Sequence, residues 1–347
     1  MHLIVPHLFP PEHFLQAAVQ GLRLPALETL VARGRRSAPP AVGLEGALCC
    51  AWGIARQRDW PWAALSREVD GGISDQAYWL RVDPVHLRIQ RDRVILLGSE
   101  LLNLPAEESA VLCADLHTHF GDAFHPLPLQ PGRWYWRLDR DPQMETTPPS
   151  LAVGRSVETL LPGGPGAAQW RALLNEIQML LARHPVNQQR EARNLPVINS
   201  VWIWGGGHVA PAALNSSPFY CQDDHLRAIA RHLGMATLAW TDKATELAPN
   251  ALVLLDQLQV FGQYGDVLGW RAAAKELDET WLAALIRSGA AIQIEDPANG
   301  GVLDFQSQDR WKFWRRRRPL AIPQESLRVK PPPEAAAVDE FGNSLGK

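Results

Sequence analysis

The chain has little cysteine, no long apolar run and almost no net charge, and each absence excludes a class of protein. Its four cysteines, Cys49, Cys50, Cys113 and Cys221, show no C-x-x-C spacing and do not form a disulfide framework pattern. No apolar stretch approaches the roughly 20 residues of a membrane-spanning helix. The first residues, MHLIVPHLFPPEHF, lack the basic segment and long apolar run of a signal peptide. The sequence therefore predicts a cytoplasmic protein with reduced thiols and no membrane contact.

The charge balance gives no general case for nucleic-acid binding, because the formal net charge is −3. One segment departs from this balance, DRWKFWRRRRPL near the C-terminus. Residues 311–318 could bind phosphates while their aromatic rings stack on bases. They could equally be a last strand, alternating Trp311 and Phe313 with Arg310 and Lys312, followed by solvated arginines. With no basic excess elsewhere we favour the strand, and nucleic acid remains an alternative partner.

Strand-like and helix-like segments alternate at both ends of the chain. Residues 2–5 and 251–255 are short apolar strands, and a helix through Leu27, Leu30 and Val31 ends near Gly34. Later, an amphipathic pattern over 270–285 predicts one long helix before a strand at 290–294. This alternation predicts an α/β fold with a mostly parallel sheet flanked by helices.

The middle of the chain has a different pattern and predicts an inserted α+β domain. Segments 78–82, 85–89 and 93–97 alternate as antiparallel strands, and 132–138 is a further strand. We therefore expect a core made of residues 1–77 and 198–322 and an insertion over 78–197. Residues 323–347 are rich in Pro and Ala with few large apolar groups, which predicts a disordered tail.

The stretch HPVNQQREARNLPVINSVWIWGGGHVAP, from His184 to Pro211, is the most distinctive in the chain. Pro185 should stop the preceding helix, and 197–204 is a predicted strand that ends in three glycines. Glycines permit unusual backbone angles or close approach of a ligand, and α/β proteins tend to bind ligands beyond strand ends. We expect ligand-binding groups here, with a plain structural turn as the alternative: His184, Asn187, Arg190, Asn199, Gly205, Gly206 and Gly207.

The motifs of this stretch resemble those of archaeal-type cofactor-independent phosphoglycerate mutases, of the alkaline phosphatase superfamily. They are HPVN, an Arg three residues later, and N-x-x-W-x-W-G-x-G. Within that group, the bacterial RpfE-type regulatory proteins are the most similar. The resemblance covers nearly all of residues 1–300 in the same order. It implies an alkaline-phosphatase-like sheet that carries an inserted α+β domain.

The resemblance also shows which catalytic groups this chain lacks. In the family, a serine in Gly-Ser-Asp is the nucleophile, activated by two metal ions. Gly43 and Gly53 reproduce the spacing of that motif, but Leu44 stands at the serine position, and no hydroxyl follows it nearby. A metal-binding Asp after the first strand is replaced by Pro6-His7, and a His-Asp pair by Ser150-Leu151.

These departures predict a catalytically degenerate protein with a regulatory role or an anionic ligand, needing no cofactor. Arg190 would pair with a small phosphorylated or carboxylate ligand, and the glycine N–H groups would donate to it. A protein partner is also possible. The alternative is a divergent, metal-dependent 2,3-bisphosphoglycerate-independent phosphoglycerate mutase or phosphatase with a rebuilt site. Its Mn or Zn ligands would be His7, His208, Asp256 and Asp266.

Overall fold

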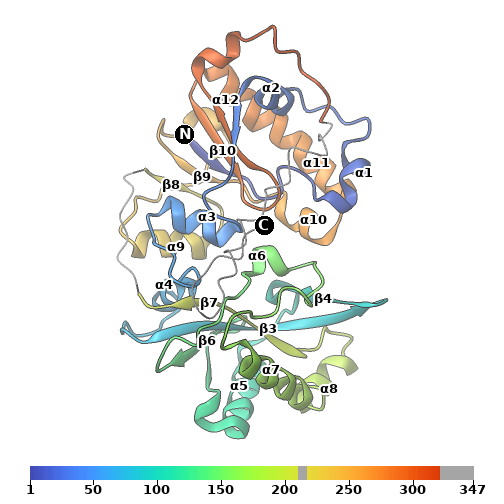
Figure 1. Ribbon diagram of the computed structural model, residues 1–347, viewed down its shortest axis with the longest axis vertical. Coiled ribbons are helices and arrows are strands. Elements are labelled where there is room, and N and C mark those ends of the chain that lie inside the picture. The colour runs from blue at the N-terminus through green and yellow to red at the C-terminus, as the bar shows by residue number, and fades with distance from the viewer. Residues whose placement is uncertain (210–216, 321–347) are drawn as a thin grey trace, which may run out of the picture.

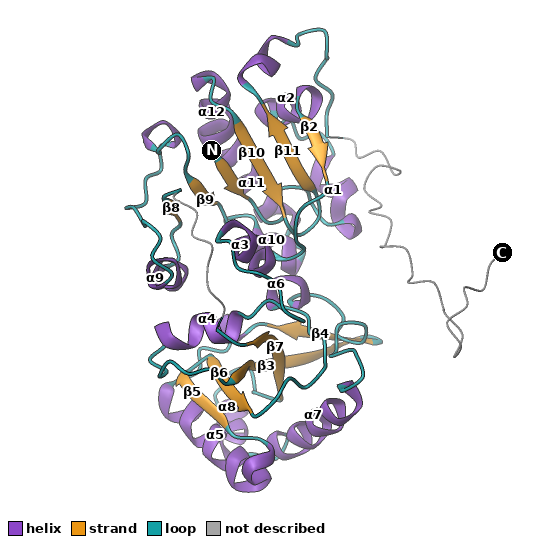
Figure 2. Ribbon diagram, turned by 60° about the vertical axis from the view of Figure 1, so that its left-hand side comes forward, coloured by secondary structure: helices purple, strands orange, loops and turns teal. Residues whose placement is uncertain are grey.

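The protein consists of two lobes, each built on one β-sheet (Figures 1 and 2). The computed structural model describes residues 1–209 and 217–320, so the predicted tail at 323–347 lies outside the described residues. No helix in the described part of the chain is long and apolar enough to cross a membrane. We call the lobe that contains the N-terminal strand the first lobe.

The first lobe contains a six-stranded sheet in the order β2-β11-β10-β1-β9-β8. The strands β10, β1, β9 and β8 run parallel, whereas β11 and β2 are antiparallel to their neighbours. The strand bounds are β1 His2–Ile4, β2 Arg35–Ser37, β8 Phe219–Tyr220, β9 Leu252–Leu254, β10 Ile292–Asp296 and β11 Gly301–Phe305. The α/β class with a mostly parallel sheet is therefore confirmed.

Helices cover the outer face of this sheet and bury a large apolar core. Their bounds are α1 Leu15–Val19, α2 Pro25–Arg33, α10 Gln259–Tyr264, α11 Val267–Leu277 and α12 Ala283–Ser288. The single helix predicted over 270–285 is interrupted by a π-helical turn, Asp278–Leu282. Asp278 accepts hydrogen bonds from the N–H groups of Ala26 and Leu27, at 3.1 and 2.7 Å. The π turn thus places a carboxylate on the open N-terminus of α2, where it compensates backbone donors and the helix dipole.

The second lobe contains an antiparallel sheet in the order β4-β3-β6-β5, with β7 also paired to β3. Its strands are β3 Tyr78–Gln90, β4 Arg93–Leu97, β5 Pro126–Gln130, β6 Arg133–Leu138 and β7 Ser200–Gly207. Two predictions were wrong here. The strands predicted over 78–82 and 85–89 form one strand through Asp83-Pro84, and β7 continues through its glycines.

Long helices cover the outer face of this sheet (Figure 2). They are α5 Ala106–Phe120, α7 Ala167–Leu181 and α8 Pro185–Ala192. Pro185 begins α8 rather than merely ending the previous helix, since the first position of a helix needs no N–H donor. Their apolar faces contribute Leu112, Leu116, Trp170 and Ile177 to a core with the strands.

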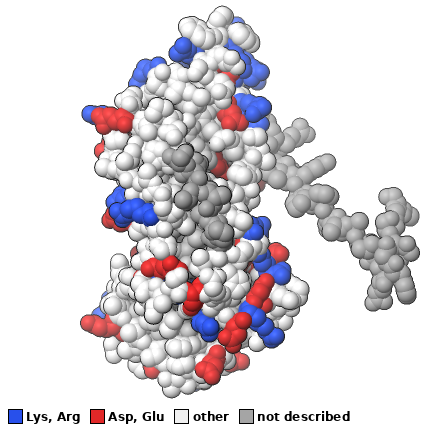
Figure 3. Space-filling model, turned by 90° about the vertical axis from the view of Figure 1, so that its left-hand side faces the viewer, with Lys and Arg blue, Asp and Glu red and all other residues white. Residues whose placement is uncertain are grey.

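A middle layer of helices joins the two lobes through one continuous core. It contains α3 Leu44–Ala51, α4 Trp62–Val69, α9 Asp224–His232 and the short α6 Pro149–Ala152. Ile4 and Leu254 from the first sheet belong to the same apolar cluster as Trp202 and Trp204 from the second. Figure 3 shows that the molecule narrows at this level, with basic and acidic side chains mixed over the visible face.

The sheet pairing differs from the predicted boundary at 197/198. The strand β7 lies beside β3 in the second sheet, and α4 packs against both of these strands. The chain returns to the first lobe at β8. Residues 62–69 and 200–207, predicted to belong to the core, thus contact the second sheet and also enter the apolar cluster shared with the first.

Candidate functional site

The polar side chains predicted to bind a ligand are mostly buried in internal contacts. His184 caps α8: its Nδ1 accepts from the Val186 N–H at 3.2 Å, and its Nε2 lies 2.9 Å from Asp115. Asn187 is buried, and its Nδ2 donates to the carbonyls of Leu181 and Ile198, at 2.8 and 2.7 Å. Both side chains therefore fix the turn between α7, α8 and β7.

Arg190 is fully buried, and its guanidinium has three internal acceptors. Its Nε donates to the Pro196 carbonyl at 2.7 Å and its Nη1 to Glu108 at 2.6 Å, while its Nη2 donates to the Leu102 carbonyl. These contacts connect α8 to Glu108 in α5 and to Leu102 in the segment between β4 and α5. An external anion would have to displace them, so we do not retain Arg190 as a ligand-binding residue.

Asn199 and the three glycines also have structural contacts. Asn199 accepts from the Leu87 N–H at 2.7 Å and donates to the Leu87 carbonyl at 2.8 Å, closing the end of the β3–β7 pair. A Cβ at Gly206 would lie 2.5 Å from Tyr78 Oη, and one at Gly207 would lie 2.6 Å from Pro61 Cβ. Gly205 has a positive φ of 68°. The glycine run therefore allows close packing against α4 and β3.

The four metal-ligand candidates are not brought together. His208 Nδ1 lies 3.0 Å from the Gln76 carbonyl, and Asp266 caps α11 by accepting from the Gly269 N–H at 2.9 Å. Asp256 follows β9, and His7 follows β1. Among residues 1–209 and 217–320, no group of three or more His, Cys, Asp or Glu side chains is placed to hold a metal ion. This donor set does not fit a two-metal centre, and we derive no chemistry from one.

Leu44, at the position that the resemblance assigns to a nucleophilic serine, is the first residue of α3. Leu44 is partly buried there, and its backbone N–H donates to Ser150 Oγ at 3.0 Å. Ser150 Oγ in turn donates to Glu45, whose carboxylate also accepts from the Ser150 N–H at 3.2 Å. Burial raises the pKa of Glu45, although the hydrogen bonds from Ser150 oppose this. Ser150, in α6, thus places a hydroxyl group beside Leu44, whereas the residues that follow Leu44 in the sequence provide none.

His7 lies just beyond the carboxyl end of β1, in a conformation with a φ of 60°. Asp296, at the end of β10, accepts from the N–H groups of His7 at 3.0 Å and Phe9 at 2.9 Å. It also accepts from the N–H groups of Ala298 and Asn299, at 3.0 and 3.2 Å. Such a left-handed conformation is unfavourable for a histidine, and it persists because the hydrogen bonds to Asp296 hold the loop in place.

The tautomer of His7 follows from its neighbours. Asn299 Nδ2 lies 2.9 Å from His7 Nδ1 and also donates to the Phe9 carbonyl at 3.2 Å, which fixes the amide orientation. Nδ1 is therefore the acceptor, and Nε2 carries the proton. Nε2 is buried without a hydrogen-bond partner among the described residues. Burial, together with the positive charges of Arg155 and His13, lowers the pKa of His7 to about 4.

A cavity of about 550 Å³ lies at this end of the parallel sheet, between the lobes. We call it the His7 cavity; its lining residues include His7, Glu12, His13, Ser150, Arg155, Gln263 and Asn299. Arg155 is exposed, and its Nη1 donates to the Leu151 carbonyl at 3.4 Å, but it has no ion-pair partner in the described part of the chain. The lining thus combines two histidines, one guanidinium without an ion-pair partner among the described residues, and several amide or hydroxyl donors with one acidic side chain.

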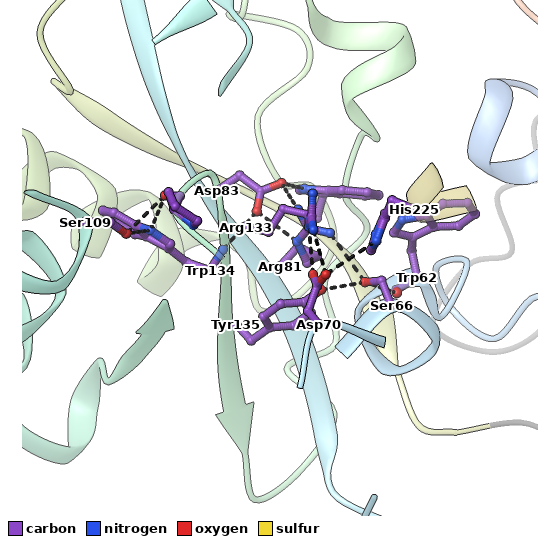
Figure 4. Close-up of polar contacts among 12 residues, drawn as sticks. Trp62, Ser66, Asp70, Arg81, Asp83, Ser109, Arg133, Trp134, Tyr135 and His225 are labelled. Carbon is purple, nitrogen blue, oxygen red and sulfur yellow. Dashed lines mark hydrogen bonds and ion pairs between the residues drawn. The ribbon is translucent and has the colours of Figure 1, made fainter. Parts of the chain in front are cut away.

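A second polar cluster lies between α4, α9 and the second sheet (Figure 4). Asp70 receives two hydrogen bonds of 2.7 Å from Arg133 and one of 2.5 Å from the Tyr135 hydroxyl. His225 Nδ1 of α9 lies 3.4 Å from the same carboxylate. Burial raises the pKa of Asp70, but these hydrogen bonds outweigh it and hold the pKa below its usual value.

A buried ion pair completes this cluster. Arg81 donates two hydrogen bonds of 2.8 Å to Asp83, which also accepts from Trp204 Nε1 at 2.8 Å. Since each charge in the cluster has an internal partner, its arrangement suits a joint between α4, α9 and the second sheet. The His7 cavity is lined by Arg155, whose charge has no ion-pair partner among the described residues, so it is the better candidate for a ligand site.

Comparison with known proteins gives short matches to one kind of enzyme. No family model matches the chain. The chain is 30% identical over 110 residues to the 2,3-bisphosphoglycerate-independent phosphoglycerate mutase of Methanosarcina barkeri. This match covers 30% of the chain and 27% of that protein. It is 29% identical over 153 residues to a Geobacter sulfurreducens protein described as a probable enzyme of the same name, covering 42% of the chain and 37% of that protein.

The chain is similar, at low identity, to cofactor-independent phosphoglycerate mutases. Each match spans well under half of the curated relative. Among solved structures, the cofactor-independent phosphoglycerate mutase of Thermoplasma acidophilum aligns over 88% of the chain and 89% of its own, with 16% identity and a TM-score of 0.37. A Pyrococcus horikoshii protein aligns over 86% and 82%, with 13% identity and a TM-score of 0.42. Neither score is high enough to support an argument about function.

Proposed function

We propose that this chain is a catalytically degenerate, phosphoglycerate-mutase-like protein that binds a small phosphorylated or carboxylate ligand in the His7 cavity. It would then act as a binding or regulatory module, the role that the resemblance to RpfE-type regulatory proteins also favours. The observation that carries the proposal is the pairing of two features. Leu44 occupies the nucleophile position, and the adjacent cavity is lined by donors and positive charge.

The loss of the family's reaction follows from the chemistry of Leu44. An aliphatic side chain cannot form a phosphoryl ester, and the four candidate ligands do not converge on a metal-sized site. Reaction through this position would need both a hydroxyl and the metal ions that lower its pKa. The Ser150 hydroxyl lies beside Leu44, but no group of the described residues is placed to hold the metal ions.

The preference for an anion follows from the cavity lining. Arg155 and His13 are close enough to His7 for their charges to lower its pKa. The buried Nε2–H of His7 is an unsatisfied donor, which costs about 1–3 kcal/mol until an acceptor reaches it. A phosphate or carboxylate oxygen would satisfy this donor, and its charge would be paired by Arg155.

Calorimetric titration with inorganic phosphate and 3-phosphoglycerate tests the binding. Arg155→Ala should weaken binding about tenfold or more, because a hydrogen bond to a charged group contributes ~1.5–3 kcal/mol. The control is Arg183→Ala, which removes an exposed arginine near the end of α7 in the second lobe. Absence of binding, or equal affinity in wild type and Arg155→Ala, would refute the proposed ligand site.

The degenerate character has its own test. Interconversion of 2- and 3-phosphoglycerate should be undetectable with added Mn²⁺ or Zn²⁺. Robust turnover would overturn the proposal in favour of a rebuilt metal-dependent site. Binding without turnover is the expected combination.

A second candidate function, a hydrolase, rests on the contacts of Ser150. Its hydroxyl lies between Glu45, which could accept the proton, and the Leu44 N–H at the start of α3, which would stabilise negative charge on Oγ. This function requires p-nitrophenyl phosphate hydrolysis that is lost in Ser150→Ala and kept in Leu44→Ala. No hydrolysis by the wild type would eliminate it.

A further inference from the structure

The segment Trp311–Arg318 is not the strand that the sequence favoured. A 3₁₀ helix, Ser307–Trp311, ends there, and the following residues are irregular. Trp311, Phe313 and Trp314 are 63%, 73% and 68% exposed. The strand prediction assumed that Trp311 and Phe313 pack against the core, and neither does. We call residues 311–318 the aromatic–arginine segment.

The segment is held against the first lobe at both ends. On one side, the side chains of Gln306 and Asp309 form a capping box, and Lys312 Nζ lies 2.5 Å from Asp309 Oδ1. The carbonyl of Arg310 accepts from Arg33 Nη1 at 2.6 Å. On the other side, Leu320 packs against the core of the first lobe. The aromatic rings are therefore displayed from a fixed place on the surface.

Positive charge surrounds these rings. Arg315, Arg316, Arg317 and Arg318 are all exposed and follow Trp314 directly. The exposed edge strand β2 adds Arg35 and Arg36, next to the Arg33 that contacts Arg310. The facing acids are largely paired: Asp309 with Lys312, Asp304 with Arg35, and Glu28 with Arg23.

We propose that the aromatic–arginine segment binds single-stranded nucleic acid. Each nucleotide presents one planar base and one negative charge, and the segment places three rings beside cations in the order Trp, Lys, Phe, Trp, Arg. Exposed rings stack on unpaired bases irrespective of sequence, and arginines pair with the phosphates. In a duplex the base faces are buried in the stack. A duplex would therefore contact the basic side chains of the segment and leave its aromatic rings without partners.

An anionic membrane is the other acidic surface that aromatic and basic residues can bind. Shallow insertion favours a continuous apolar tip with charge at its margin. Here Lys312 separates Trp311 from Phe313 and is paired to Asp309. This interleaving matches a nucleic-acid strand better than a lipid surface.

The test is fluorescence anisotropy of the full chain with labelled single-stranded DNA and RNA of roughly 20 nucleotides, longer than the ~4–16 nucleotides of typical single-stranded sites. If the four arginines each contact one phosphate, log K against log salt should have a slope of about −3, from −0.7 per contact. Replacing Arg315–Arg318 by alanine should abolish that slope. Replacing Trp311, Phe313 and Trp314 by alanine should weaken binding at least tenfold and leave the slope unchanged.

Because these side chains are exposed, both variants should keep the wild-type melting temperature, and Arg183→Ala serves as a charge control. No binding at low salt would overturn the proposal. So would binding that the aromatic variant leaves unchanged, since that is simple polyelectrolyte attraction. Stronger binding to phosphatidylserine vesicles than to the oligonucleotides, lost in the aromatic variant, would assign the segment to membranes instead.

Discussion

Arg190→Ala should destabilise the protein by about 3–5 kcal/mol, the range for removing one partner of a buried ion pair. The substitution strands the carbonyls of Pro196 and Leu102 and removes one of the two arginines that pair with Glu108. Two lost acceptor contacts at ~1–3 kcal/mol each give a similar total, roughly 4 kcal/mol. Glu108 remains paired with Arg193 in the variant, so the loss of stability should stay below the upper end of the ~3–5 kcal/mol range.

Urea unfolding followed by tryptophan fluorescence measures this difference, because Trp134, Trp136 and Trp170 lie in the core of the second lobe. The matched control is Arg193→Ala. It removes the other partner of the same carboxylate, but its side chain is 51% exposed, so the expected loss is below about 1 kcal/mol.

The reasoning fails if Arg190→Ala lies within about 1 kcal/mol of wild type, the range of exposed pairs. It also fails if Arg190→Ala abolishes phosphate binding in a protein that remains folded at the assay temperature, because Arg190 would then contact the ligand. The expected pattern is a large stability loss with Arg190→Ala and a large affinity loss with Arg155→Ala.

Three further predictions concern the surroundings of the site. The pKa of His7 in the folded protein, about 4, lies below the ordinary histidine value of about 6.5, so the unfolded chain takes up its proton first as pH falls. Relative to His7→Gln, urea unfolding should show about 3 kcal/mol of stability lost from pH 6.5 to pH 4. Asp296→Ala should lower the unfolding free energy by about 3–6 kcal/mol, since four N–H groups lose their acceptor at ~1–3 kcal/mol each with partial relaxation, and an unchanged melting temperature would contradict the role of Asp296. Gly206→Ala should cost about 1–3 kcal/mol, because its Cβ meets Tyr78 Oη at 2.5 Å, whereas Gly163→Ala, with nothing within 4 Å, should leave the melting temperature unchanged.

Local patterns predicted the fold class well. The sequence predicted the helix ending before Gly34 and the strands at 251–255 and 290–294. Their signals, apolar periodicity and glycine or proline boundaries, act within a few residues. Residues 236–240 form no strand, and Thr237 makes an isolated bridge to Phe219 in β8. Strand β8 is two residues long, a property of the tertiary arrangement that no local pattern reveals.

The candidate site was harder to predict, because the sequence pattern of a polar residue is the same whether its side chain binds a ligand or hydrogen-bonds to a neighbouring carbonyl. Asn187 and Arg190 match a binding motif in type and spacing, yet their partners lie in α5, α7 and the connection before β7. The cavity residues are joined by long-range contacts: His7 to Asp296 and Asn299, and Leu44 to Ser150. Only the resemblance singled out positions 7, 44 and 150, as places where the family's catalytic or metal-binding residues are replaced.

Those three positions are linked by contacts between distant parts of the chain. The Ser150 hydroxyl accepts from the first N–H of α3 and donates to the buried Glu45. Asp296 holds the His7 loop by accepting from backbone N–H groups. The cavity beside these positions is lined by His7 and by Arg155, whose charge has no ion-pair partner among the described residues. A small anion bound there would therefore meet one uncompensated positive charge and polar donors, as the proposed ligand site requires.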